Sequence, residues 1–176
     1  LGLLLVDEPH SQEQYETIVA WARAVKTTAP DLVIWEDPQP PDPEPWVLEM
    51  FELADVLCPL RSQYITKPAW YRETLADYQA DGKELWFYSA NGPARTFDPF
   101  SYYLLQAWHA FKIGAKGTNF WAFGDNGGVS CWNEYPAAGN GPYCPTYIDA
   151  TSVTPAKYME AIREGIEDYE YLTMLL

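Results

Sequence analysis

Short apolar runs alternate with longer segments of helical periodicity along the whole chain. The apolar runs predict strands over residues 3–6, 32–35, 56–60, 85–88 and 118–123. The segments between and after them predict helices over residues 11–30, 47–54, 66–82, 102–113 and 154–172. We expect a capping box of Ser11 and Gln14 at the start of the first helix, a long loop from residue 124 to about 153, and Ile166 on the inner face of the last helix. Strands and helices that alternate in this way form right-handed βαβ units around a parallel sheet. The nearly continuous apolar strands indicate a sheet that is covered on both faces.

Two architectures fit this order of elements: a doubly wound open sheet and part of a (β/α)₈ barrel. Neither a GxGxxG nor a Walker A motif follows any predicted strand, which disfavours the nucleotide-binding doubly wound sheets. A complete barrel takes about 250 residues, and this chain of 176 begins inside an apolar run. We therefore predict an α/β fold, a partial (β/α)₈ TIM barrel with roughly strands four to eight and their helices, as a single domain over residues 1–176.

The charge balance limits the partners of the protein. Acidic residues outnumber basic ones by 25 to 11, and the formal net charge is −14. Nucleic acids and anionic membranes attract basic surfaces, so neither is expected to bind. No stretch approaches the roughly 20 apolar residues that span a bilayer. The 8 Trp and 13 Tyr residues combine flat apolar faces with polar atoms, which suits carbohydrate as well as a core.

The cysteines and histidines do not predict a metal site. Cys58 lies in an apolar run and is expected to be a buried thiol. Cys131 and Cys144 flank a loop rich in Gly, Pro and Asn, and their disulfide-bonded and reduced states are both open. Neither His10 nor His109 lies near a cysteine in sequence, which disfavours zinc. No metal or cofactor is predicted. This sequence does not indicate a location, and an extracellular or periplasmic one is expected for the parent protein.

Asp7 and Glu8 are the strongest chemical signal, because two acids end a buried apolar strand. Successive strand residues point to opposite faces, but the following Pro9 allows an irregular exit that would turn both acids toward one site. Glycosidic cleavage needs a proton donor and a negative group near the developing oxocarbenium ion. We predict Asp7 and Glu8 as the catalytic pair; in the structural alternative, Asp7 caps the next helix and Glu8 pairs with an arginine.

Other polar and aromatic residues also follow the predicted strands, where barrels and doubly wound sheets place their sites. Tyr and Asn offer directional hydrogen bonds to hydroxyl or acetamido groups, and Trp offers a face for stacking. The candidates for substrate binding are Trp35, Glu36, Tyr88, Asn91, Arg95, Trp121, Asp125 and Trp132. Structural alternatives remain open for three of them: Trp35 in the core, Glu36 in a surface turn and Arg95 as a loop anchor.

Three segments together resemble the catalytic domain of glycoside hydrolase family 123 and its relatives in domain of unknown function 4091. They are Asp7-Glu8-Pro9, Trp-Ala-Phe-Gly-Asp at 121–125, and the closing run Arg-Glu-Gly-Ile-Glu-Asp-Tyr-Glu-Tyr-Leu at 163–172. The resemblance covers essentially the whole chain, as the part of the barrel from its fourth strand onward. It implies a β-N-acetylgalactosaminidase that works by substrate-assisted retaining catalysis, which needs no enzyme nucleophile. Glu8 would be the general acid/base, and Asp7 would orient the 2-acetamido group and stabilise the oxazolinium intermediate.

Two other functions remain open. One is a conventional retaining glycosidase with Glu8 as the acid and Glu36 as the nucleophile, and the other is a non-catalytic carbohydrate-binding or structural module. By this resemblance, the chain corresponds to the barrel without its first three strands. A barrel that lacks three strands exposes two sheet edges and an apolar interior. We therefore expect this chain by itself to be inactive and poorly stable.

Overall fold

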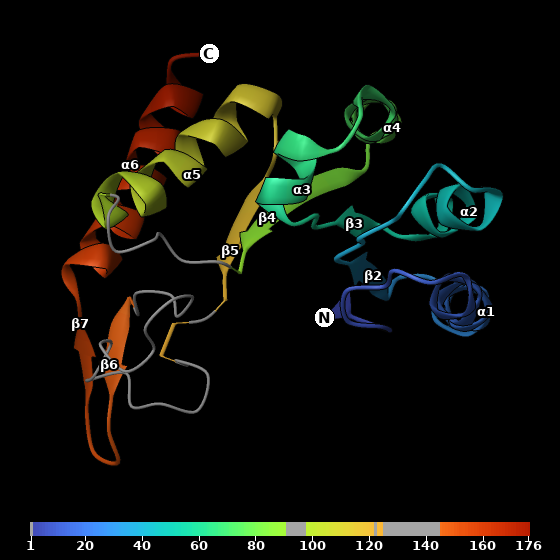
Figure 1. Ribbon diagram of the computed structural model, residues 1–176, viewed down its shortest axis with the longest axis horizontal. Helices are drawn as coiled ribbons and strands as arrows, with labels where there is room; N and C mark the ends of the chain where they lie inside the picture. Colours follow the sequence, from blue (N-terminus) through green and yellow to red (C-terminus); the bar gives the residue numbers. More distant parts are fainter. Residues whose placement is uncertain (1, 91–97, 122, 125–144) are drawn as a thin grey trace. The chain divides into compact units, whose positions relative to one another are not determined.

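The computed structural model describes residues 2–90, 98–121, 123–124 and 145–176 (Figure 1). Contacts divide the chain into two compact units, Leu1–Tyr88 and Ser89–Leu176. Among the described residues, none of the helices is both long enough and apolar enough to cross a bilayer.

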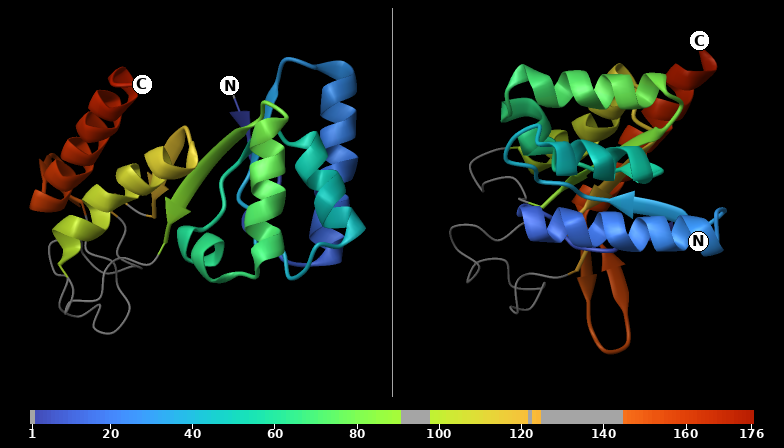
Figure 2. Two further views of the ribbon diagram at one scale, coloured as in Figure 1. Left: turned by 90° about the horizontal axis from the view of Figure 1, so that it is seen from above. Right: turned by 90° about the vertical axis from the view of Figure 1, so that its right-hand side faces the viewer.

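The first unit repeats strand and helix in the predicted order. Its strands are β1 (Gly2–Leu3), β2 (Val33–Glu36), β3 (Val56–Leu57) and β4 (Glu84–Ser89), of which the last residue belongs to the second unit. Its helices are α1 (Gln12–Thr28), α2 (Pro45–Leu53), α3 (Arg61–Thr66) and α4 (Ala69–Ala80). Figure 2 shows α1, α2 and α4 side by side along one face of these strands.

The strand order distinguishes the predicted partial barrel from the doubly wound alternative and confirms the prediction. β1 pairs with β2, β2 with β3 and β3 with β4, each in parallel. The amide of Trp121, just after β5 (Gly117–Phe120), donates to the carbonyl of Ser89 at 2.9 Å, and the sheet order is β1-β2-β3-β4-β5. A doubly wound sheet reverses its order at a switch point, whereas a barrel adds each strand beside the previous one. The fold is therefore α/β of the partial-barrel type.

Helix α1 is fixed by hydrogen bonds at its start and by a buried face along its length. The Gln14 side chain accepts from the amide of Ser11 at 3.2 Å and from that of His10 at 3.0 Å, as in the predicted capping box. One face of the helix is buried and consists of Tyr15, Ile18, Val19 and Ala22. The core of the first unit is formed by fully buried side chains of the strands and helices, including Ile34, Val47, Met50, Leu57, Tyr71, Leu75, Leu85 and Phe87. Cys58 is buried there, as predicted.

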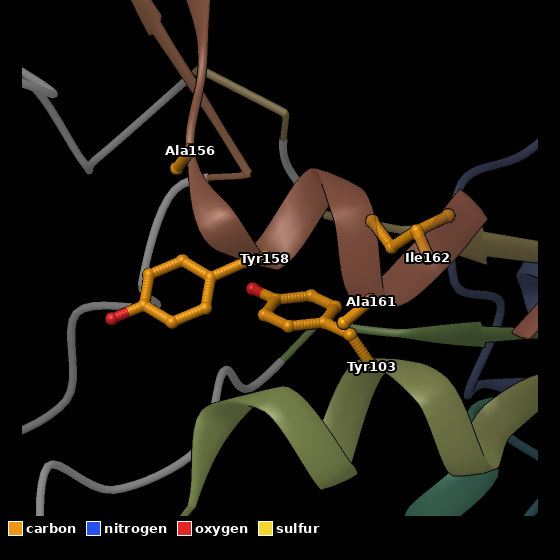
Figure 3. Close-up of a cluster of buried hydrophobic side chains, with 5 residues drawn as sticks. All are labelled: Tyr103, Ala156, Tyr158, Ala161 and Ile162. Carbon is orange, nitrogen blue, oxygen red and sulfur yellow. The ribbon is translucent and has the colours of Figure 1, made fainter. Parts of the chain in front are cut away.

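The second unit is built on the packing of α5 (Pro99–Ile113) against α6 (Lys157–Met174). Asp98 caps α5 by accepting from the amide of Phe100 at 3.0 Å, and Gly114 ends it in the left-handed conformation. A buried cluster joins the two helices and consists of Tyr103, Ala156, Tyr158, Ala161 and Ile162 (Figure 3). A Cβ on Gly165 would lie 2.6 Å from the carbonyl oxygen of Leu104, so close approach of the helices requires glycine at this position.

The structure corrects three expectations about local elements. Helix α3 was not predicted, and the expected loop before the last helix contains a hairpin of β6 (Thr146–Ile148) and β7 (Val153–Pro155). Asp149 holds the hairpin turn by accepting from the amides of Thr151 and Ser152. Ile166, expected on the inner face of the last helix, is 49% exposed. The buried face passes through Ala161 and Gly165 instead, because small residues allow the close packing.

Candidate active site

Residues at or just beyond the ends of the first unit's four strands meet in one hydrogen-bonded group. The contributing residues are Glu8 after β1, Asp37 and Gln39 after β2, Gln63 in α3 after β3, and Tyr88 in β4. Parallel strands bring their carboxyl ends to one edge of a sheet, which is why residues distant in sequence meet there. The predicted acid Glu8 lies within this group.

Glu8 has an unusual backbone conformation. Its φ is 47°, in the left-handed region that glutamate rarely adopts. Two hydrogen bonds hold this part of the chain: the Glu8 amide donates to Asp37 Oδ1 at 2.8 Å, and the Gln39 amide donates to the carbonyl oxygen of Pro9 at 3.0 Å. A strained residue persists where its surroundings over-determine it, and such residues cluster at functional sites. The irregular strand exit predicted from Pro9 is therefore confirmed.

The Glu8 side chain is half-buried and accepts a hydrogen bond from the Tyr88 hydroxyl at Oε1. Tyr88 in turn accepts from Gln39 Nε2 at 3.1 Å. Burial and the bond to Glu8 raise the pKa of Tyr88, so its hydroxyl stays protonated and able to donate. Among the described residues Glu8 forms no ion pair with an arginine, and the N-cap of α1 is Ser11. These contacts disfavour the structural alternative for both acids.

Asp7 is exposed to solvent beside the same group. Burial is the main cause of the raised pKa of Asp37, and the charges of Asp7 and Glu8 raise it further. Asp7 and Glu8 therefore both lie near Asp37. This placement is compatible with two carboxylates that serve one substrate, and their joint role stays a prediction.

The second acidic pair, Glu36 and Asp37, is buried, with 0% and 6% of its surface exposed. Glu36 Oε1 accepts from the Leu5 amide at 3.0 Å, so Glu36 does not lie in a surface turn. Burial raises the pKa of Glu36 to about 8, although the amides of Leu5 and Val6 lower it in part. Burial also raises the pKa of Asp37 to about 7, against the lowering effect of the Glu8 amide. Glu36 is therefore mostly protonated at neutral pH, which makes it a poor nucleophile.

The remaining candidates are placed as follows. Trp35 is half-buried in β2 on the face opposite Glu36, next to Gly2. Trp121 belongs to the second unit and is 63% exposed, which leaves its ring open to solvent. Outside the described residues lie Asn91, Arg95, Asp125 and Trp132, and also Cys131 and Cys144.

Gln39 and Gln63 belong to the site but were not predicted from the sequence. Gln63 Nε2 donates to Gln39 Oε1 at 2.6 Å, and the half-buried Gln39 reaches Tyr88 from the loop after β2. Their signal was positional, since both lie a few residues beyond the end of a strand. No group of three His, Cys, Asp or Glu residues in the described part of the chain is arranged to hold a metal ion.

The fold is similar to those of two solved glycosidases. One is a family 123 glycoside hydrolase from Clostridium perfringens, studied for glycolipid glycan hydrolysis, with a TM-score of 0.64 and 14% identity. The other is the endo-β-1,4-mannanase from Thermotoga petrophila, with a TM-score of 0.59 and 15% identity. The matches cover 99% and 96% of this chain, but 31% and 44% of those chains. This chain thus spans less than half of either structure, and at these identities the likeness shows the fold.

No protein-family model matches the chain, and the search of curated proteins finds no match.

Proposed function

We propose that this chain carries the general-acid part of a glycoside hydrolase active site, with Glu8 as the acid/base. The observation that carries the proposal is the way Glu8 is held: its backbone is fixed at a positive φ by Asp37, and its Oε1 is bound by Tyr88. A half-buried carboxyl with one oxygen fixed presents the other to a ligand in a defined direction. The likeness in fold to two glycosidases supports this reading.

The substrate class we propose is a terminal 2-acetamido-2-deoxy-hexoside, with β-N-acetylgalactosaminide as the first choice. Glu8 gives its proton to the glycosidic oxygen while the acetamido carbonyl oxygen attacks the anomeric carbon and the bond to the leaving group breaks. The Asp7 carboxylate stabilises the positive charge of the resulting oxazolinium ion. Glu8 then takes a proton from water as the water oxygen attacks the anomeric carbon, which restores the acetamido group with retained configuration.

Two features support substrate assistance over a conventional nucleophile. Asp7 directly precedes Glu8 and lies near the same carboxyl group of Asp37, so a second charge is available beside the acid. Glu36, the nucleophile of the rival mechanism, is fully buried with a pKa of about 8. A carboxyl group that is mostly protonated and covered cannot attack an anomeric carbon efficiently. The strained Glu8 also argues against a purely binding module, because a binding surface has no need to aim one carboxylate.

Activity tests on the complete gene product distinguish the three functions. We expect hydrolysis of an aryl N-acetyl-β-galactosaminide, no comparable hydrolysis of the aryl β-galactoside with a 2-hydroxyl, and competitive inhibition by a thiazoline that mimics the oxazolinium ion. Glu8→Gln should abolish turnover while the thiazoline still binds. Equal hydrolysis of both glycosides would favour a conventional nucleophile, and sugar binding without hydrolysis would favour a binding module.

A further inference from the structure

Behind Glu8, three polar side chains form a hydrogen-bonded chain that runs in one direction. Gln63 Nε2 donates to Gln39 Oε1 at 2.6 Å, and Gln39 Nε2 donates to the Tyr88 hydroxyl at 3.1 Å. The Tyr88 hydroxyl donates to Glu8 Oε1. Each link thus uses one donor and one acceptor, and the chain ends on the proposed acid.

The direction follows from the donor and acceptor inventory of the groups. The Gln39 oxygen is occupied by Gln63, so its NH₂ group faces Tyr88. A phenolic hydroxyl has a single hydrogen, and once Gln39 donates to its oxygen, that hydrogen is directed to Glu8. Only 9% of the Tyr88 surface is exposed, which limits competition from water.

The loop that carries Gln39 is itself fixed on both sides. The Tyr71 hydroxyl donates to the Pro38 carbonyl at 3.1 Å, and Lys67 Nζ donates to the Pro40 carbonyl at 2.6 Å. The backbone amide of Gln39 donates to Pro9. Gln39 is therefore held in place before any ligand arrives, as a group that positions a catalytic side chain should be.

We infer that Gln39, oriented by Gln63, is a positioning residue that makes Tyr88 a hydrogen-bond donor to Glu8 Oε1. Because Oε1 accepts this bond, Oε2 is the oxygen that carries the transferred proton. The inference rests on the proposed function of Glu8 as the acid/base. It assigns no contact with substrate to Gln39 or Gln63, which act only through Tyr88.

A double-mutant cycle on the complete gene product tests the inference. We expect Tyr88→Phe to lower kcat about 30-fold and Gln39→Leu to lower it about tenfold, with KM within about twofold of the wild type in both. The larger loss falls on Tyr88→Phe because a hydrogen bond to a charged group is stronger than one between neutral groups. In the Tyr88→Phe background, Gln39→Leu should cause no further loss. Loss of the donor to the carboxylate should also move the alkaline limb of kcat/KM to higher pH in both single variants.

Two further variants complete the design. Gln12→Leu makes the same change on the exposed side of α1 and should leave kcat within about twofold, as surface substitutions usually do. Gln63→Met should lower kcat about threefold, and this loss should also vanish in the Tyr88→Phe background. If Gln39→Leu melts well below the wild type, Gln63→Met takes its place in the double-mutant cycle with Tyr88→Phe.

The outcomes separate the inference from the function on which it rests. An active wild type in which Gln39→Leu leaves kcat unchanged, or lowers it equally with and without the Tyr88 hydroxyl, would overturn the inference alone. A wild type that hydrolyses no glycoside would overturn the proposed function and the inference with it.

Discussion

Two acidic pairs follow neighbouring parallel strands with nearly the same sequence pattern, Asp7-Glu8-Pro9 after β1 and Glu36-Asp37-Pro38 at the end of β2. Their surroundings differ. Asp7 is exposed and Glu8 half-buried, whereas Glu36 and Asp37 are covered by the first unit. The same pattern thus produces one pair that meets solvent and one that is enclosed.

The enclosed pair, Glu36 and Asp37, binds the backbone around the accessible pair, Asp7 and Glu8. Glu36 accepts from the Leu5 amide and Asp37 accepts from the Glu8 amide, at the point where β1 has already ended. The parallel register of β1 and β2 places the end of β2 beside the chain after β1. Backbone donors that a strand ladder would otherwise occupy are satisfied by carboxyl groups instead. Burial and hydrogen-bond partners, more than residue type, distinguish the two roles.

The largest expected effect is a difference in activity between variants of Glu8 and Glu36. Glu8→Gln should lower kcat/KM of the complete gene product by about 10³-fold, the middle of the usual range for loss of a general acid. Glu36→Gln keeps an oxygen that can accept from Leu5 and should stay within about threefold. Steady-state kinetics on one aryl glycoside measures both. Similar losses in the two variants would show that the two glutamates do not differ in role.

A smaller effect is expected from the support that Asp37 gives to Glu8. Asp37→Ala removes the acceptor of the Glu8 amide and should lower kcat about 30-fold, because Glu8 is then free to leave its strained conformation. Asp37→Asn retains an oxygen acceptor and should lose about threefold or less. Equal kcat values for the alanine and asparagine variants would show that the hydrogen bond to Glu8 does not position the acid.

The enclosed pair should also make stability depend on pH. The folded pKa values of Glu36 and Asp37, about 8 and 7, exceed the ordinary values of 4.5 and 3.8. Between these limits the folded state holds protons that the unfolded chain has released. Stability contributed by the pair is therefore complete below about pH 4 and falls as the pH rises to 8, by at most about 1.4 kcal/mol per pH unit for each group.

Denaturant unfolding of the complete gene product between pH 4 and 9 measures this slope. Glu36→Gln should flatten the decline between pH 5 and 8, whereas the exposed control Glu13→Gln should retain it. A Glu36→Gln protein with the wild-type slope would mean that Glu36 is ionised in the folded state and would remove the main argument against it as a nucleophile.

The smallest expected effect concerns the start of helix α1, which follows Asp7 and Glu8. Gln14→Ala removes the acceptor for the amides of Ser11 and His10 and should lower the free energy of unfolding by about 0.5–1 kcal/mol. Its kcat should match the wild type, because the Asp37 bond still fixes Glu8. The exposed Gln12→Ala is the control and should cost less. A large loss of kcat in Gln14→Ala would show that the capping box, too, positions Glu8.

Much of the fold could be predicted from the sequence, because the alternation of apolar runs and helical faces fixes both the order and the type of most elements. The hairpin of β6 and β7 was missed because its strands are short and largely exposed, so burial imposes little alternation on them. The inner face of α6 was misjudged at Ile166, since the contact with α5 selects small residues rather than large apolar ones.

For the site, the sequence signalled Glu8 through its position after a strand, but it did not show that Glu36, at the end of the next strand, is enclosed while Glu8 is accessible. That distinction depends on which carboxyl is enclosed and on the amides it meets, and both follow from strand register. Gln39 and Gln63 carried no motif, because an ordinary amide side chain gains a specific role only when the fold places it beside Tyr88.

The dependence of rate on the leaving group tests most directly whether Glu8, and not Glu36, donates the proton. Aryl N-acetyl-β-galactosaminides whose phenols span a range of pKa should be compared in the wild type, Glu8→Gln and Glu36→Gln. We expect the loss of rate in Glu8→Gln to grow as the phenol becomes less acidic, because less acidic phenols need protonation to depart. The rates of Glu36→Gln should run parallel to those of the wild type. A Glu8→Gln line parallel to the wild type, with a steeper line for Glu36→Gln, would contradict this expectation.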